Sequence, residues 1–282
     1  MTYNCAYRKG IEILRNAGIE APANDAGVLL CLAAKCDRTF IYAHGDRMLE
    51  EGVRQHYQEM LRKRAHGYPL QHITGVQEFM SLIFEVSPDV LIPRQDTELL
   101  VEAVIDTCGS GRTEILDMCT GSGCIAVSLA WHLTGCFVVA ADIMPEAIRI
   151  AAKNASKNGV SERICFIQSD LFAEIPTKKF DVIVSNPPYI RTRDIDGLRR
   201  EVKGFEPAAA LDGGIDGLAF YREIIRNSPA YLKNSGMLAF ETGYDQAGEV
   251  AAMLTSDGRY QDIIILKDLA GIDRVVTARH VY

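Results

Sequence analysis

The feature that most constrains the fold is an alternation of strand-like and helical segments that begins near Gln95 and continues to the C-terminus. Short runs rich in Val and Ile predict strands, at 114–118, 137–142, 164–169, 180–185, 237–241, 263–266 and 275–278. Helical spacing of apolar residues fills most of the intervals, at 97–108, 123–132, 145–158, 216–231 and 246–255. This alternation predicts an α/β fold with a doubly wound, mostly parallel sheet. The last two strands have no helix between them, which predicts an antiparallel end of the sheet.

The chain before Gln95 has a different pattern. From Cys5 to about Ala65, apolar residues recur at helical spacing and strand-like alternation is absent. The next stretch sets Phe79, Phe84 and other apolar residues among glycine and proline, which predicts a short extended hairpin. For a chain of 282 residues, one large and one smaller domain are expected. We therefore predict a helical domain over 1–73, a hairpin linker over 74–94 and a larger domain over 95–282.

Composition narrows the class of protein. Hydrophobic residues make up 48% and charged residues 24% of the chain, as in an ordinary globular protein. No apolar run is long enough to span a membrane, and the first ten residues do not resemble a secretory signal. Eight cysteines are scattered without a Cys-x-x-Cys pair, which favours a reduced, cytoplasmic location and no metal site. A formal charge of -7 disfavours a nonspecific nucleic-acid binder.

A glycine loop follows the first strand of the larger domain, in the order Asp117-Met118-Cys119-Thr120-Gly121-Ser122-Gly123. Glycines let the backbone turn tightly and approach a ligand, and the helix that follows presents free amide groups. The second strand ends at Asp142, where a carboxylate can accept hydrogen bonds from ribose hydroxyls. Together these features predict a nucleoside site. They do not separate a methyltransferase from an NAD enzyme or from a noncatalytic nucleotide-binding module, because the loop also fits the NAD pattern.

The second motif, Asn186-Pro187-Pro188-Tyr189, follows the buried strand 180–185. Two prolines have no N–H, so nearby carbonyls remain available as acceptors. The amide oxygen of Asn186 is a further acceptor, and the Tyr189 ring can stack on a flat group. Such a cluster suits a planar –NH2 group, whose two hydrogens need two acceptors. A proline turn that only ends a strand is the alternative, and a nucleoside loop at the same sheet edge argues against it.

The motif resembles that of methyltransferases that modify amino nitrogens of adenine, cytosine or glutamine. The rest of the chain, from about residue 5 to residue 279, resembles the HemK/PrmC family. The segments that carry this resemblance are 68–75, Glu78-Phe79, 90–98, 180–190, Glu206-Pro207, 211–218, Tyr221-Arg222 and 268–274.

The resemblance implies a class I, Rossmann-like methyltransferase that uses S-adenosyl-L-methionine to methylate N5 of a glutamine side chain. The substrate implied is the Gly-Gly-Gln motif of class I peptide-chain release factors, gripped in part by the helical domain. The implied cofactor residues are Cys119, Thr120, Gly121, Ser122, Gly123, Asp142, Asp170, Leu171 and Asn186. The implied substrate residues are Asn186, Pro187, Pro188 and Tyr189, and among these Asn186, Pro187 and Tyr189 are the expected catalytic residues.

Three positions depart from the family pattern. Cys119 stands where the family usually has a glycine, Gln95 replaces a proline, and Leu171 is often aromatic in relatives. Arg94 and Glu98 are either cofactor contacts or charges at a helix start. A ribosomal-protein glutamine methyltransferase and a nucleic-acid amino-methyltransferase remain alternatives. Which release factors are accepted and the oligomeric state are left open.

Overall fold

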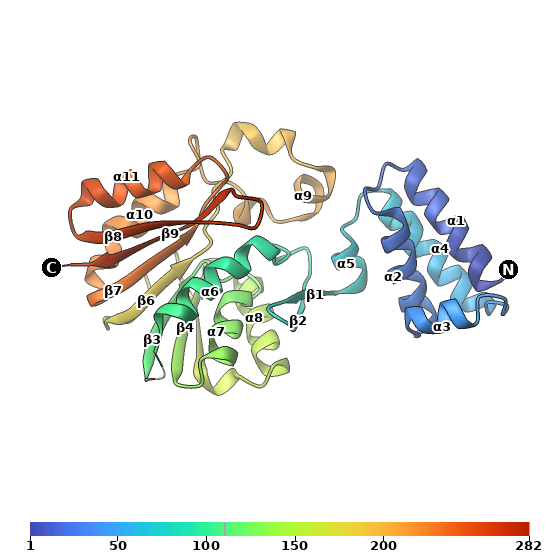
Figure 1. The fold of residues 1–282 in the computed structure, drawn as a ribbon, viewed down its shortest axis with the longest axis horizontal. Helices are drawn as coiled ribbons and strands as arrows, with labels where there is room; N and C mark the ends of the chain where they lie inside the picture. Colours follow the sequence, from blue (N-terminus) through green and yellow to red (C-terminus); the bar gives the residue numbers. More distant parts are fainter. Residues whose placement is uncertain (110, 282) are drawn as a thin grey trace. The chain divides into compact units, whose positions relative to one another are not determined.

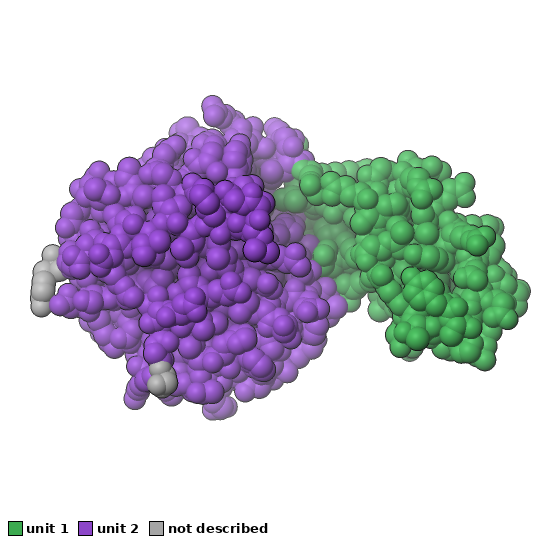
Figure 2. All heavy atoms as spheres, in the orientation of Figure 1, with its two compact units in different colours: residues 1–75, 199–205 green, residues 76–198, 206–282 purple. Residues whose placement is uncertain are grey.

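The structure is a computed structural model that describes residues 1–109 and 111–281 (Figure 1). The last residue of the expected larger domain, Tyr282, and Ser110 lie outside the described residues. The described chain divides into two compact units, which Figure 2 shows in different colours. Unit 1 contains Met1–Gly75 and Arg199–Phe205, and unit 2 contains Val76–Leu198 and the chain from Glu206 onward.

Unit 1 is helical. Its elements are α1 (Tyr3–Asn16), α2 (Pro22–Ala34), α3 (Arg38–Ala43), α4 (Glu51–Ala65), α5 (Leu70–Thr74) and α9 (Arg200–Phe205). Leu14, Leu29 and Leu30 form its buried centre with Tyr57, whose hydroxyl donates to the Ala26 carbonyl at 3.1 Å. Among the residues that the structure describes, no helix is long and apolar enough to cross a membrane.

Helix α9 comes from a distant part of the sequence and joins unit 1 through two kinds of contact. The buried Arg64 guanidinium pairs with Asp25 at 2.7 Å and with Glu201 of α9 at 2.8 Å. The rings of Tyr68 and Phe205 lie with their centroids 4.2 Å apart. The sequence did not predict this helix, because six residues are too few to show a helical period.

Unit 2 begins with an antiparallel hairpin of β1 (Val76–Phe79) and β2 (Leu82–Glu85). The side chain of Asn154, fully buried, joins this hairpin to the glycine loop. It accepts from the Glu85 amide at 2.7 Å and donates to the carbonyls of Glu85 at 3.0 Å and Ser122 at 2.9 Å. The hairpin is thus hydrogen-bonded to the part of unit 2 that carries the predicted site.

Within the described residues, seven strands form one sheet in the order β5-β4-β3-β6-β7-β9-β8. Strands β3 to β7 are parallel, and β9 runs antiparallel to both β7 and β8. The strands are β3 (Thr113–Met118), β4 (Cys136–Asp142), β5 (Ile164–Gln168), β6 (Phe180–Ser185), β7 (Leu232–Glu241), β8 (Tyr260–Lys267) and β9 (Asp273–His280).

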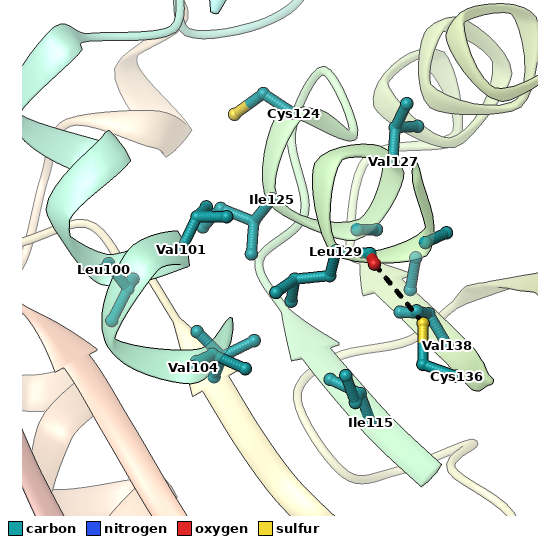
Figure 3. Close-up of a cluster of buried hydrophobic side chains, with 14 of the residues drawn as sticks. Leu100, Val101, Val104, Ile115, Cys124, Ile125, Val127, Leu129, Cys136 and Val138 are labelled. Atoms are coloured by element: carbon teal, nitrogen blue, oxygen red, sulfur yellow. Dashed lines mark hydrogen bonds between the residues drawn. The ribbon is translucent and has the colours of Figure 1, made fainter. Parts of the chain in front are cut away.

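Helices cover both faces of this sheet (Figure 1). Helices α6 (Glu98–Thr107), α7 (Cys124–His132) and α8 (Pro145–Lys157) cover one face, and α10 (Ala219–Asn227) and α11 (Ala247–Asp257) the other. Neighbouring strand residues point to opposite faces, so Ile115 packs with Val104 and Leu129 (Figure 3) while Leu116 joins the other cluster. Short 3₁₀ turns complete the unit: η1 (Gln95–Thr97), η2 (Ser161–Arg163), η3 (Thr192–Gly197), η4 (Ala208–Ala210) and η5 (Ser228–Ala230).

The predicted α/β fold, with a helical region and an antiparallel end of the sheet, is confirmed. Several element boundaries differ from the prediction by one to five residues, and two of the larger differences have a visible cause. Strand β7 begins at Leu232 instead of Met237, because its register on β6 shifts between Phe180 and Val182. Helix α10 begins at Ala219, because the Asp216 carboxylate turns back onto the Leu218 amide and the Arg222 guanidinium.

Candidate active site

The two sequence motifs lie side by side at one edge of the sheet. Strand order reverses between β3 and β6, and the last residues of these strands, Met118 and Ser185, are paired. The Ser185 hydroxyl donates to the Met118 carbonyl at 2.7 Å. In an open α/β sheet, such a reversal leaves a crevice outside the carboxyl ends of the strands, where ligands bind.

The glycine loop is held by a buried carboxyl beneath it. Asp117 accepts from the Thr120 hydroxyl at 2.5 Å and from the Ala126 amide of α7 at 3.1 Å. Burial raises the pKa of Asp117 to about 7, although these two bonds act in the opposite direction. The carboxyl therefore ties the loop to the first turn of α7.

The loop backbone is left-handed at Cys119 (φ 63°), Gly121 (φ 55°) and Gly123 (φ 80°). The conformation costs a residue with a side chain roughly 1–2 kcal/mol. Cys119 adopts it nevertheless, and its partly buried side chain packs against the core cluster of that sheet face. Packing of the thiol offsets part of the cost of the missing glycine.

Asp142 ends β4 beside this loop. Its carboxylate accepts from the Gly121 amide at 2.8 Å and from the Met144 amide at 3.0 Å. Burial raises the pKa of Asp142, and hydrogen bonds from the Met144, Gly121 and Ile143 amides oppose that change. Asp142 thus fixes the backbone on both sides of it and also forms part of the wall of the cavity beside the loop.

The cavity has a volume of about 290 Å³, near the lower end of the range for small-molecule sites. Of the residues predicted for the site, nine line it: Cys119, Thr120, Gly121, Ser122, Asp142, Asp170, Leu171, Asn186 and Pro188. Gly123, Pro187 and Tyr189 do not. The sequence did not assign Ile143, Pro207, Ala209, Ala210 or Phe220 to the site, although these residues also contribute to the lining.

The wall at Asp170 and Leu171 is a tight turn. Leu171 has φ 47°, and the Ser169 hydroxyl donates to the Leu171 carbonyl at 2.6 Å and accepts from the Glu174 amide at 3.0 Å. Ser169 therefore fixes the turn that presents Leu171 to the cavity.

The motif Asn186-Pro187-Pro188-Tyr189, called the amide motif below, is held by hydrogen bonds to residues outside it. Asn186 donates through Nδ2 to the Thr97 hydroxyl at 3.2 Å, and the Tyr189 hydroxyl lies 3.5 Å from Glu241 Oε1. The Tyr189 carbonyl accepts from Gln246 Nε2 at 2.9 Å. Thr97 accepts one hydrogen of Nδ2, and the Asn186 side chain also interacts with the Glu241 carboxyl, so the amide oxygen is the group left for a ligand.

Arg94 lies at the cavity, whereas Glu98 contacts the hairpin. Arg94 lines the cavity and pairs with Glu206 at 2.6 Å. Glu98 accepts from the Met80 amide at 2.7 Å and so holds the hairpin turn. In the part of the chain that the structure describes, no group of three or more His, Cys, Asp or Glu side chains is arranged to hold a metal ion.

The fold and site define a methyltransferase with a doubly wound sheet. A family model described as "Methyltransferase small domain" matches residues 94–199. A solved structure of a methyltransferase from Pyrococcus furiosus shares the fold, with a TM-score of 0.53, 16% identity and coverage of 71% of this chain and 90% of that one.

The particular family follows from longer matches. A model of the PrmC N-terminal domain matches residues 6–75. A release factor glutamine methyltransferase of Moorella thermoacetica is 42% identical over 281 residues, covering 99% of this chain and 98% of its own. One from Clostridium botulinum is 39% identical over 274 residues and covers 96% of each. The chain belongs to the release factor glutamine methyltransferase family, which confirms the resemblance seen in the sequence.

The glycine loop makes a testable contrast. An alanine Cβ at Gly121 would meet no atom within 4 Å, whereas at Gly123 it would lie 2.8 Å from the Ala151 Cβ and 3.0 Å from its Cα. We expect Gly121→Ala to cost about 1 kcal/mol for its left-handed backbone. Gly123→Ala should cost at least about 1 kcal/mol more, because α7 and α8 must separate. Denaturant unfolding measures both.

Ala151→Gly is the control for the close contact. In a double-mutant cycle it should recover part of the Gly123→Ala loss and none of the Gly121→Ala loss. Equal losses for the two glycine variants would mean that packing against Ala151 does not constrain the loop.

Proposed function

We propose that this chain transfers a methyl group from S-adenosyl-L-methionine to the side-chain nitrogen (N5) of the glutamine in the Gly-Gly-Gln motif of class I peptide-chain release factors. The relatives that span nearly the whole chain carry the name release factor glutamine methyltransferase. The observation that carries the proposal is the orientation of Asn186, whose amide nitrogen is bonded to Thr97 while the residue lines the cavity. An acceptor at that place suits a substrate –NH2 group.

The cavity residues fit the proposed cofactor. A carboxylate at Asp142 suits ribose hydroxyls, and Leu171 with the Asp170 backbone offers an edge for adenine. The loop Cys119–Gly123 brings the backbone amides near the start of α7 to the same cavity. When bound, S-adenosylmethionine supplies an electrophilic methyl group, and the protein supplies alignment.

The alignment task falls on the amide motif. An amide nitrogen is a poor nucleophile because its lone pair is delocalised into the carbonyl. The Asn186 amide oxygen and the Pro187 carbonyl would accept its two hydrogens, fix its plane, and favour positive charge on nitrogen as it forms. The Tyr189 ring would meet the flat face of the substrate amide. No general base is assigned, because the methylated nitrogen is strongly acidic until it loses its proton.

The cellular setting follows from the substrate. Each of the eight cysteines, all of which lie within the described residues, is a free thiol. Free thiols suit the reducing cytoplasm, where release factors act. A ribosomal-protein glutamine and an amino group of nucleic acid remain the alternative substrates. Incubation of the enzyme with labelled S-adenosylmethionine and cell extract, followed by mapping of the labelled peptide, separates them.

The cofactor site is tested at Asp142. Loss of a charged hydrogen bond costs about 1.5–3 kcal/mol, so Asp142→Ala should weaken S-adenosylmethionine binding by about tenfold to a hundredfold or more in calorimetry. Because Asp142 also holds the Gly121 and Met144 amides, Asp142→Asn is the cleaner variant, since it retains an acceptor oxygen and the side-chain size.

Asp257→Asn is the matched control. Its carboxylate pairs with Arg259 outside the cavity, so cofactor affinity should not change. Unchanged affinity in both Asp142 variants would remove this residue from the site. Tight NAD binding without S-adenosylmethionine binding would overturn the assignment as a methyltransferase.

The substrate clamp is tested at Asn186. Asn186→Ala offers no acceptor, so the glutamine –NH2 is no longer fixed, and displacement by about 1 Å can slow transfer on the order of a hundredfold. The loss should appear in single-turnover methylation of a release factor and leave cofactor affinity nearly unchanged. Tyr189→Ala should slow transfer, and Tyr189→Phe should be mild.

The substrate supplies its own control. A release factor with Gly-Gly-Glu in place of Gly-Gly-Gln has no side-chain –NH2 and should take up no label at that residue. Near-normal turnover in a folded Asn186→Ala enzyme would mean that the amide is held elsewhere.

We further propose that the helical region over 1–73 recognises the release factor, because a small cavity contacts few side chains of a protein substrate. Deletion of this region is a poor test, since it would also strip α9 of its partners Arg64 and Tyr68. Hydrogen exchange on the whole chain avoids this problem. Addition of the Gly-Gly-Glu release factor should slow exchange in peptides from 1–75. Protection restricted to peptides from unit 2 would contradict the recognition role.

A further inference from the structure

Behind the amide motif lies a carboxyl group that the proposed reaction does not use. Glu241 ends β7 and is only 2% exposed. Its Oε1 lies 3.5 Å from the Tyr189 hydroxyl, and its main-chain carbonyl accepts from the Tyr221 hydroxyl at 2.9 Å. A buried carboxyl is costly unless polar groups surround it, so its place at the end of a core strand calls for a role.

Thr97 is a second polar group that contacts Asn186 and interacts with this carboxyl. Thr97 ends the turn η1 at the start of α6, is 2% exposed, and lines the cavity. Its hydroxyl oxygen accepts from Asn186 Nδ2 at 3.2 Å. The Glu241 carboxyl is the acceptor near this pair, because hydrogen bonding by both the Thr97 and the Asn186 side chains favours its ionised form. Its Oε2 atom is buried and has no closer hydrogen-bond partner among the described residues.

The direction of these bonds has a consequence for Asn186. An ionised carboxylate can only accept, so it favours hydrogens of both Thr97 and Asn186 Nδ2 on its side. The Thr97 oxygen is then an acceptor on the side of Asn186, which draws Nδ2 to it and leaves Oδ1 for the cavity. A reversed amide would present its own –NH2 to the substrate –NH2, and two donors cannot bond.

We propose that Thr97 and Glu241 are positioning residues that fix which way the Asn186 amide points, and thereby make its oxygen the acceptor for the substrate nitrogen. This inference rests on the proposed role of Asn186 in holding the glutamine amide. Neither Thr97 nor Glu241 needs to touch the reacting atoms.

The charge state of Glu241 controls the arrangement. Burial raises the pKa of Glu241 to about 7, with Asp96 acting in the same direction, while Thr97, Arg274 and Asn186 lower it. The other titratable groups that interact with it are Tyr189, Tyr221 and Cys124. Because the folded pKa lies above the usual value near ~4.3, the ordering carboxylate is present above about pH 7 and is lost below it. A protonated Glu241 can also donate, so it no longer fixes which of Thr97 and Asn186 donates and which accepts.

The test uses three variants of the full chain and single-turnover methylation of a release factor from pH 5.5 to 9. Thr97→Val removes the hydroxyl and should slow transfer at least about tenfold with cofactor affinity within about twofold. Thr97→Ser keeps the hydroxyl and should restore transfer. Glu241→Gln, which can donate or accept, should slow transfer at high pH and abolish the fall in rate below about pH 7.

Asp96→Asn is the matched control. This variant removes a charge that raises the pKa of Glu241 but none of the hydrogen bonds among Glu241, Thr97 and Asn186. The fall in rate should therefore persist and move to lower pH. A Thr97→Val enzyme as fast as wild type, or a Glu241→Gln enzyme with an unchanged pH profile, overturns the inference alone. A wild-type chain that methylates no release factor overturns the proposed function and this inference with it.

Discussion

The pairing of β3 with β6 is the constraint on which the site depends. From β3 the sheet extends through β4 to β5 in one direction and through β6 and β7 in the other. Helices therefore pack on both faces of the sheet, and the loops that follow the strands line a cavity at its carboxyl edge. Since every parallel strand ends at this edge, the glycine loop, Asp142, the amide motif and Glu241 are brought together although they are far apart in the sequence. The sheet thus sets the distances between these four groups, and side-chain hydrogen bonds make only small adjustments to their positions.

Two buried carboxyls and one partly buried carboxyl at that edge show how polar groups are held in place there. Asp117 binds the glycine loop, Asp142 binds the Gly121 amide, and Glu241 faces the amide motif. Burial raises the pKa of each, and hydroxyl or amide donors oppose that rise. Asp117 Oδ1 and Glu241 Oε2 nevertheless have no hydrogen-bond partner in the part of the chain that the structure describes. Such groups stabilise the protein little, because desolvation opposes the bonds they make. Their effect is to restrict loops and side chains to one arrangement before a ligand arrives.

The sequence predicted the fold, and nine of its predicted site residues line the cavity, because the relevant signals are local. Strand β6 was placed with the bounds observed, Phe180–Ser185, and the glycine loop and Asp142 follow strands that are legible as apolar runs. Thr97 and Glu241 were not predicted, since their roles depend on a contact between β7, η1 and Asn186 that no spacing reveals. An acid that ends a buried strand at the ligand edge, as in Phe240-Glu241, is the one signal that could have indicated Glu241. Helix α9 was missed for a similar reason, because only the contacts with Arg64 and Tyr68 assign it to unit 1.

The place of α9 limits how this protein can be rearranged by recombination. Unit 1 consists of Met1–Gly75 together with Arg199–Phe205, so its chain is interrupted by much of the other unit. A hybrid gene joined once near Gly75 would pair the helical region of one relative with the α9 of another. Arg64 and Tyr68 would then meet a foreign Glu201 and Phe205, and the two lineages would have to match at those positions. Unit 1 is therefore encoded by two separate segments of the gene, and a successful graft of this unit requires that both segments be moved.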